Sequence, residues 1–284
     1  MIGARRFGRG PNRIGAGTRS GRRWRWAIAG AVIGGLAVIL WQLPAAWIIA
    51  PAVARASGQR LQLLAVQGSV WNGSAVVALT GNDGKLESLA LPGRLQWRLR
   101  PAWDRRALIG IGLAADLDQP CCLQGPARLR IAWTPRQLVV DMPAIAWKGP
   151  AAWLAGLGTP WNTIAPEGLL TLTLHNASFS QTEGRPAFSG QAMLEVHDVV
   201  SRLSPIHPLG SYRLALTGRA GKTPRLEMST TSGVLQISGQ GTFANGYLHF
   251  NGQAQAAAGH EAALANLLDI IGRRQGAISV ISFG

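Results

Sequence analysis

Apolar and polar residues alternate one by one along much of the chain after residue 55. Leu95, Trp97 and Leu99, for example, stand between polar neighbours such as Gln96 and Arg98. The same alternation recurs over residues 129–133, 170–174, 194–196, 212–216, 235–237 and 248–250. Because successive side chains of a β-strand point to opposite faces, this period predicts strands with one buried and one solvated face.

Turn-forming residues separate these runs. They include Glu183-Gly184, Ala220-Gly221-Lys222 and Asn245-Gly246. An Asn-Gly pair suits a type I′ hairpin, in which both central residues need a positive φ. Short strands with turns at this spacing predict an antiparallel arrangement. We therefore expect an all-β domain over residues 55–284, formed by an extended, curved antiparallel sheet.

Two segments have helical character instead. Ala151–Leu157 is short and apolar, whereas Glu261–Gly272 carries apolar residues at a spacing of three to four: Leu264, Leu267, Leu268 and Ile271. Gly272 is a suitable stop for this helix, and the cations Arg273 and Arg274 suit the negative end of its dipole. We expect the second helix to cover one end of the sheet.

A weak internal similarity accompanies this pattern. Gly93–Trp97 and Gly190–Leu194 each open a strand that leads through a Pro-containing connection into another. One interpretation is two similar halves with a boundary near residue 160, and the other is a meander of similar strands.

The N-terminal segment carries a different pattern. No charged residue occurs from Trp26 to Ala54, and roughly 20 apolar residues match the hydrocarbon thickness of a bilayer. We therefore expect a single transmembrane anchor over residues 26–50. The anchor is flanked by Arg22, Arg23 and Arg25, with Trp26, Trp41 and Trp47 at the interfaces. Positive residues stay on the cytoplasmic side, so residues 1–25 form a cytoplasmic tail and the β domain is periplasmic.

A cleaved signal peptide is the alternative to an anchor, since Ala52-Val53-Ala54 offers a small-x-small cleavage site. The apolar run, however, is longer than the roughly 7–15 residues typical of a signal peptide. Within the run, Gly30 and Gly34 form a G-x-x-x-G pair that can let two membrane helices approach closely. The alternative is that glycine is simply frequent in membrane helices.

Net charge does not indicate a nucleic-acid binder. The chain has a formal charge of +15, but eight of its 28 Lys and Arg residues lie in the first 25 positions, which contain no acid. In the β domain Arg94, Arg98 and Arg100 form the one basic cluster with an aromatic residue beside it, and a solvated strand face explains it. With 47% apolar and 14% charged residues, the composition also excludes a disordered chain.

The sequence shows no catalytic, cofactor or metal site. The His residues lack metal-ligand spacing, and the adjacent Cys121 and Cys122 cannot by themselves complete a four-ligand zinc site. The two cysteines can form a vicinal disulfide, pair between chains or lie in a solvated loop. Asp116 and Asp118 fit a turn better than a glycosidase pair. We expect neither an enzyme nor a small-molecule substrate.

Several stretches occur in an order that resembles protein N of the bacterial type II secretion system. They are LPAAWIIAPAVARASGQRLQL, VQGSVWNGSAVVAL, GRLQWRLRPAW, LSPIHPLGSYRLALTG and the closing segment from SGVLQISGQ to LLDIIGRRQG. The resemblance implies a single-pass inner-membrane protein whose periplasmic domain supports export of folded proteins across the outer membrane. Its expected partners are other subunits of the system, in the inner-membrane platform or linked to the secretin.

Such a domain would bind partners through a sheet edge or an apolar patch. Candidate contacts are the turn at Trp71, Asn72 and Gly73, and the connection of Pro208, Leu209, Gly210 and Tyr212. For both segments the alternative is that these residues only shape the fold. The alternative function is an anchored periplasmic β-groove that handles lipid, since a packed core and an open apolar trough produce the same alternation.

Overall fold

The computed structural model describes residues 20–80, 89–102, 111–157, 161–183, 185–244 and 247–284. The expected Asn245-Gly246 turn and residues 1–19 of the expected tail lie outside the described residues. Contacts divide the chain into two compact units, residues 1–42 and residues 43–284. Each unit is described below by itself.

The first unit consists, in its described part, of helix α1 (Ser20–Gln42). Its apolar side chains are mostly exposed, for example Ile33 at 67% and Ile39 at 60%. The helix ends just before Leu43, because a residue that precedes a proline, here Pro44, disfavours the helical conformation. Among the described residues, no helix combines the length and the hydropathy that crossing a membrane requires.

Over its described residues, the second unit contains one antiparallel sheet of 15 strands. The N-terminal strands are β1 (Leu61–Gly68), β2 (Asn72–Leu79), β3 (Leu89–Ala90), β4 (Leu95–Ala102), β5 (Ile111–Asp118), β6 (Ala127–Trp133) and β7 (Gln137–Pro150). They are followed by β8 (Glu167–Thr182), β9 (Arg185–Val200), β10 (Gly210–Gly218), β11 (Arg225–Gly233), β12 (Leu235–Ala244), β13 (Tyr247–Ala256), β14 (Arg273–Gln275) and β15 (Ile278–Phe283).

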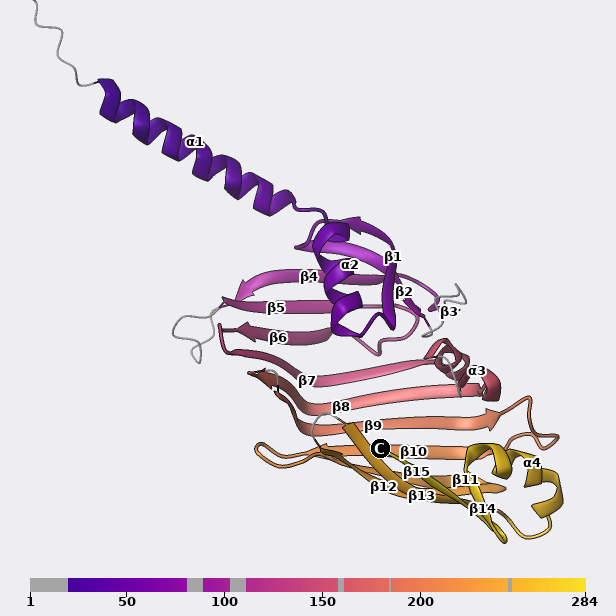
Figure 1. Ribbon diagram of the computed structural model, residues 1–284. Helices are drawn as coiled ribbons and strands as arrows, with labels where there is room; N and C mark the ends of the chain where they lie inside the picture. Colours follow the sequence, from indigo (N-terminus) through magenta and orange to yellow (C-terminus); the bar gives the residue numbers. More distant parts are fainter. Residues whose placement is uncertain (1–19, 81–88, 103–110, 158–160, 184, 245–246) are drawn as a thin grey trace, which may run out of the picture. The chain divides into compact units, whose positions relative to one another are not determined.

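The sheet is a meander in which each strand pairs with the next along the chain (Figure 1). Among the strands that the structure describes, β3 pairs only with β2, and β15 lies between β13 and β14. The expectation of an all-β antiparallel body with short helices is confirmed. The sheet also continues across residue 160, because β7 and β8 pair from Gln137↔Thr182 to Pro150↔Leu169.

Every alternating run named above lies in a strand. The prediction of a turn at Asp116 and Asp118 is wrong, since both residues lie in β5. Asp116 pairs in register with Arg98 on β4 and Arg128 on β6, so cross-strand charge pairing stabilises a strand there.

In the described part of this unit, four short helices accompany the sheet: α2 (Ala45–Ala56), η1 (Ala151–Leu157), α3 (Trp161–Ile164) and α4 (Glu261–Ile271). The predicted helical segments at 151–157 and 261–272 are thus confirmed, with η1 wound as a 3₁₀-helix. Helix α2 starts inside the segment expected to be the anchor. Its Ala45 is fully buried against Ala75 and Trp97 of the sheet.

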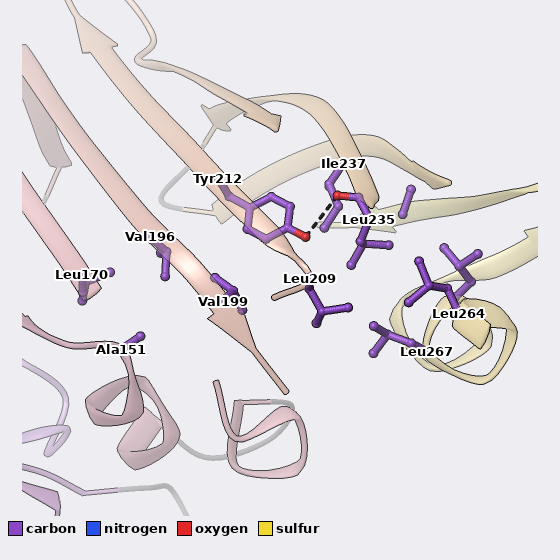
Figure 2. Packing of buried hydrophobic residues seen from close by; sticks show 12 residues of the cluster. Ala151, Leu170, Val196, Val199, Leu209, Tyr212, Leu235, Ile237, Leu264 and Leu267 are labelled. Carbon is purple, nitrogen blue, oxygen red and sulfur yellow. Dashed lines mark hydrogen bonds between the residues drawn. The ribbon is translucent and has the colours of Figure 1, made fainter. Parts of the chain in front are cut away.

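The larger core lies around strands β8–β13 (Figure 2). Leu264, Leu267 and Leu268 of α4 are at most 2% exposed and pack in one cluster with residues of the sheet, of η1 and of the β9–β10 connection. Those residues are Ala151, Leu170, Val196, Val199, Leu209, Tyr212, Leu235, Ile237 and Ala254. The apolar face of α4 therefore closes this end of the sheet, as its residue spacing predicts.

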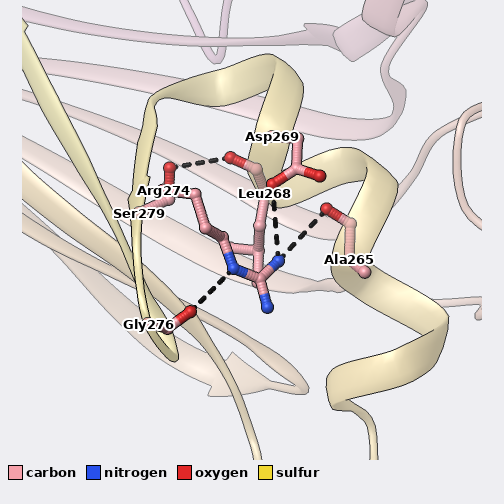
Figure 3. Close-up of polar contacts among 6 residues, drawn as sticks. All are labelled: Ala265, Leu268, Asp269, Arg274, Gly276 and Ser279. Carbon is pink, nitrogen blue, oxygen red and sulfur yellow. Dashed lines mark hydrogen bonds and ion pairs between the residues drawn. The ribbon is translucent and has the colours of Figure 1, made fainter.

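Side chains from β14 and β15 satisfy carbonyl groups of α4 (Figure 3). Ser279 Oγ donates to the Leu268 carbonyl oxygen at 2.7 Å. Arg274 donates to the Ala265 carbonyl at 3.3 Å and lies 3.5 Å from the Asp269 carboxylate. A cation thus lies against the last turns of the helix, where the helix dipole favours it.

Candidate interaction surfaces

The residues expected to flank a membrane anchor occupy two helices. Arg25, Trp26 and Trp41 lie in α1, and both Trp side chains are exposed, at 74% and 69%. Trp47 lies in the first turn of α2 and is 75% exposed. Arg22 and Arg23 also belong to α1, but their side chains lie outside the described part of the structure.

Gly30 and Gly34 lie in α1 with open space around them. A Cβ atom built on either glycine meets no atom within 4 Å. Both interpretations of this pair, a helix-association face and an ordinary occurrence of glycine, are compatible with that arrangement.

The candidate turn at Trp71, Asn72 and Gly73 packs around a buried aromatic residue. The Trp97 ring is 5% exposed, and its Nε1 donates to the Val70 carbonyl at 3.2 Å. A Cβ atom on Gly73 would lie 2.5 Å from Cζ2 of Trp97, so only glycine fits against the ring. Asn72 is exposed.

The candidate connection from Pro208 to Tyr212 belongs to the main core. Leu209 is 2% exposed and Tyr212 is 7% exposed. The Tyr212 hydroxyl donates to the Leu235 carbonyl at 3.1 Å, and burial raises the pKa of this phenol above its ordinary value. Gly210 has a φ of 156° and approaches Ser232 so closely that a Cβ atom would lie 2.5 Å from its carbonyl oxygen.

Strands β4–β6 carry charged side chains on one face. Arg98 pairs with Asp116, Asp116 pairs with Arg128, and Arg100 forms an ion pair with Asp116. Arg98, Asp116 and Arg128 border a cavity of about 320 Å³ that is also lined by Asn72, Gln96 and Asp118. Of the predicted cluster of Arg94, Arg98 and Arg100, the last two thus lie on a solvated strand face with acidic residues interspersed. Arg94 precedes β4 and donates to Ser74 Oγ and to the Ala65 carbonyl.

The other face of the same region is apolar across five strands. Leu113 pairs with Ile131, Ile131 with Val140, Val140 with Phe179, and Phe179 with Phe188. Directly paired residues lie on the same side of a sheet, so these five side chains form one row. The row is half-buried, and Phe179 is 37% exposed.

The N-terminal edge strand β1 is irregular and partly covered. Its pairing with β2 shifts between Leu64 and Gln67, where Ala65 has a φ of 48°. The Arg94 guanidinium donates to the Ala65 carbonyl at 2.7 Å, and α2 packs against the strand. Bulges and covering elements of this kind obstruct the addition of another strand.

The C-terminal edge is more open. Strand β14 pairs only with residues 278–280 of β15, whereas β15 continues to Phe283 along β13. Within the described residues, the outer side of Ile281–Phe283 therefore has no strand partner. Ser282 is exposed in this segment.

Cys121 and Cys122 form a vicinal disulfide, one of the arrangements that the sequence left open. The loop that carries it is held along β7 by two hydrogen bonds: Gln124 N to the Ala146 carbonyl at 2.9 Å, and Lys148 N to the Cys122 carbonyl at 2.7 Å. Over the described residues, no group of three or more His, Cys, Asp or Glu side chains is arranged to hold a metal ion.

Comparison with known proteins identifies one family. A family model described as type II secretion system (T2SS), protein N, matches residues 59–280, from just before β1 into β15. No curated protein and no solved structure matches the chain. The family match confirms the resemblance found in the sequence.

Proposed function

The chain belongs to the protein N family of the type II secretion system, and on this premise we propose that it is an anchored docking subunit. Its sheet body binds partner subunits in the periplasm and supports export of folded proteins across the outer membrane. It acts by binding rather than by catalysis. The membership itself places the chain among the components of the secretion machinery.

The observation that carries the docking role is the open C-terminal edge of the sheet. The outer backbone of Ile281–Phe283 can accept a strand from another subunit.

The anchoring role is assigned to α1. Its apolar run lacks Asp, Glu, Lys and Arg after Arg25, and exposed Trp26 and Trp41 stand at its ends. Tryptophan rings favour the interfaces of a bilayer, and flanking arginines keep the N-terminus in the cytoplasm. A periplasm-dependent reporter fused after residue 60 should therefore be active, and one fused at residue 20 inactive. Activity of both fusions, or of neither, would contradict this topology.

Site-specific photocrosslinking in cells tests the docking edge. A photoreactive amino acid at Ser282 should crosslink to another subunit of the secretion system. The matched control is Gln240, which is also exposed but lies on internal strand β12, where Glu227 and Asn251 pair on either side. Equal adducts at both positions, or none at Ser282 in actively secreting cells, would contradict the assignment.

Lipid handling is a second candidate because of the apolar row from Leu113 to Phe188. If this row holds acyl chains, Phe179→Glu should reduce the lipid that copurifies with the chain and leave the Ser282 crosslink unchanged. If the row only packs the fold, the wild-type protein should copurify without stoichiometric lipid. The two functions are thus separated by one substitution and two measurements.

A further inference from the structure

Basic side chains gather at one end of the strands. In a meander, every second connection lies at the same end, so the β6–β7, β8–β9 and β10–β11 turns share an end, as Figure 1 shows. Five exposed basic residues occur in or beside these turns: Arg136, Arg185, Arg219, Lys222 and Arg225. We call this the basic end. The described residues of its turns contribute one acidic side chain, Glu183.

The opposite end of the strands has a different character. It carries the connections that contain η1, α3 and α4 (Figure 1). Charges of both signs are mixed there, as in the pair formed by Asp269 and Arg274. The excess of positive charge is therefore a property of one end of the sheet, and the solvated faces of the strands do not account for it.

Two basic residues of the β10–β11 turn and the first residue of β11 surround a hollow. Arg219, Lys222 and Arg225 line a cavity of about 380 Å³ together with Thr217, Thr223 and Glu227. No ion pair joins any of the three basic residues to another residue within the described part of the chain. Three cations beside two threonine hydroxyl groups form a suitable environment for a phosphate.

Exposed tryptophans occur at the same end. Trp133 is the last residue of β6, three residues before Arg136, and is 60% exposed. The β1–β2 turn also lies at this end of the meander, and the chain enters the body beside it, where Val70 N donates to the Leu43 carbonyl. Trp47, 75% exposed, follows in the first turn of α2.

We propose that the basic end docks onto the headgroups of an anionic bilayer, with lipid phosphates held at Arg219, Lys222 and Arg225 and with Trp133 and Trp47 at the interface. Charge complementarity supplies the attraction, and tryptophan side chains favour the headgroup region. The chain enters the sheet body beside the β1–β2 turn, at the basic end. This entry point favours a membrane over an acidic protein as the binding partner of the basic end. The proposal rests on the anchoring role assigned to α1, because that anchor would bring this end of the body to the bilayer.

Lipid photocrosslinking with the full chain in vesicles tests the proposal. The photoreactive residue replaces Ala220, which lies exposed between Arg219 and Lys222, or the matched exposed Ala262 of α4 at the opposite end. Vesicles contain phosphatidylcholine alone or with about one third phosphatidylglycerol, so that only the second membrane attracts basic residues. We expect lipid adducts at Ala220 in the anionic vesicles, few in the neutral ones, and few at Ala262 in either.

Charge variants sharpen the test. Arg219→Gln and Lys222→Gln alter exposed turn residues without removing packed side chains, and each should lower the Ala220 adduct about fivefold. High salt should also lower the yield of the Ala220 adduct, because salt screens the interactions of exposed charges. Equal adduct yields at Ala220 and Ala262 would overturn the proposal. So would an Ala220 adduct whose yield is unchanged by phosphatidylglycerol and by the charge variants.

A third probe separates this proposal from the anchor on which it rests. A photoreactive residue at Leu36 of α1 should crosslink to acyl chains in both kinds of vesicle. Lipid adducts at Leu36 without adducts at Ala220 would overturn docking of the basic end while supporting the anchor. Adducts at Ala220 without adducts at Leu36 would support docking and contradict the anchor. Protein adducts at Ala220 in cells, with no lipid adduct in anionic vesicles, would identify an acidic partner and overturn the proposal.

Discussion

Apolar surface is buried in two different ways at the two edges of the sheet. Near β1–β4 the buried cluster consists of Ala45, Ala75 and Trp97, with one large side chain among two small ones. Around β8–β13 and α4 the buried cluster contains twelve residues, most of them aliphatic. Trp97 is thus the one large buried side chain of the first cluster, and partly buried Ile49, Leu63, Val66, Leu99 and Leu117 pack against it, whereas many buried side chains share the second.

This difference follows from the elements that cover each region. Helix α2 presents Ala45 and Ile49 to the sheet but leaves Trp47 and Ile48 exposed, so it adds little volume to the N-terminal cluster. Helix α4 inserts three leucines that are almost inaccessible to solvent. One continuous sheet can therefore bury one large ring among small and partly buried side chains at one edge and a distributed set of aliphatic side chains at the other.

The largest expected effect is that of Trp97→Ala. Loss of the ring leaves a cavity between Gly73 and α2 and should lower the free energy of unfolding by about 3–5 kcal/mol. Hydrogen exchange should show lost protection in β1–β5, with β10–β13 unchanged. The control Trp133→Ala removes an exposed ring and should change stability by less than about 0.5 kcal/mol. Loss of protection throughout the sheet would show that the two clusters unfold as one.

The next effect is expected from Leu268→Ala in α4. Removing this buried side chain should cost about 3 kcal/mol, measured by chemical denaturation, with exchange increased in α4 and β12–β15. Ile270→Ala provides the control, because Ile270 lies two residues away in the same helix and is 46% exposed. If Leu268→Ala instead matched the loss caused by Trp97→Ala and spread to β1, the contrast between a distributed core and a single ring would be lost.

A smaller effect is expected from Tyr212→Phe. Near neutral pH the variant leaves the buried Leu235 carbonyl without its partner, which should cost about 1–2 kcal/mol. Burial raises the pKa of Tyr212 in the folded state. The contribution of Tyr212 to the free energy of unfolding is therefore complete below the unfolded-state pKa of about 10, and it declines as the pH rises above about 10. The decline should approach about 1.4 kcal/mol per pH unit.

The raised folded-state pKa of Tyr212 determines how the stability of the protein should change with pH. Denaturation at a series of alkaline pH values should show the wild-type advantage over Tyr212→Phe shrinking above pH of about 10 and then reversing. An advantage that stayed constant across this range would mean that the phenol is as accessible to ionisation in the folded state as in the unfolded one.

The smallest effects are expected from ion pairs on the two solvated faces. Arg100 and Asp116 pair in the N-terminal region, and Arg213 and Glu195 pair at 2.8 Å in the C-terminal region. Both pairs are partly exposed, so double-mutant cycles should give coupling energies of about 0.2–1 kcal/mol for each. Similar coupling energies for the two pairs would mean that the two regions differ only in their apolar clusters. A much larger coupling energy for either pair would mean that the charged faces differ as well.

The spacing of apolar residues along the sequence predicted most of the secondary structure. The alternation around Trp97, Leu172 and Leu214 predicts strands because it depends only on the period of a strand's side chains. The spacing of Leu264, Leu267 and Leu268 predicts α4 for the same kind of reason. The turn expected at Asp116 and Asp118 was wrong because the stabilising partners, Arg98 and Arg128, come from neighbouring strands and cannot be seen in a local window.

The candidate contacts show the same division. The sequence singled out Trp71–Gly73 and Pro208–Tyr212, yet Leu209 and Tyr212 lie in the core and Gly73 packs on Trp97. The open segment at Ile281–Phe283 had no signal in the sequence, because an edge is defined by the absence of a neighbouring strand. The basic end was equally hidden, since Arg136, Arg185 and Lys222 are far apart along the chain.

The sequence by itself determined the family, the strand-rich class, the two short helical segments and the Arg-rich N-terminal tail before an apolar run. These properties are written in composition and in periods of two and about four residues. The tertiary structure alone decided the order of 15 strands in one sheet, the different filling of its two apolar clusters and the common end of the basic turns. Those features arise from pairing between strands, which depends on contacts that no local pattern specifies.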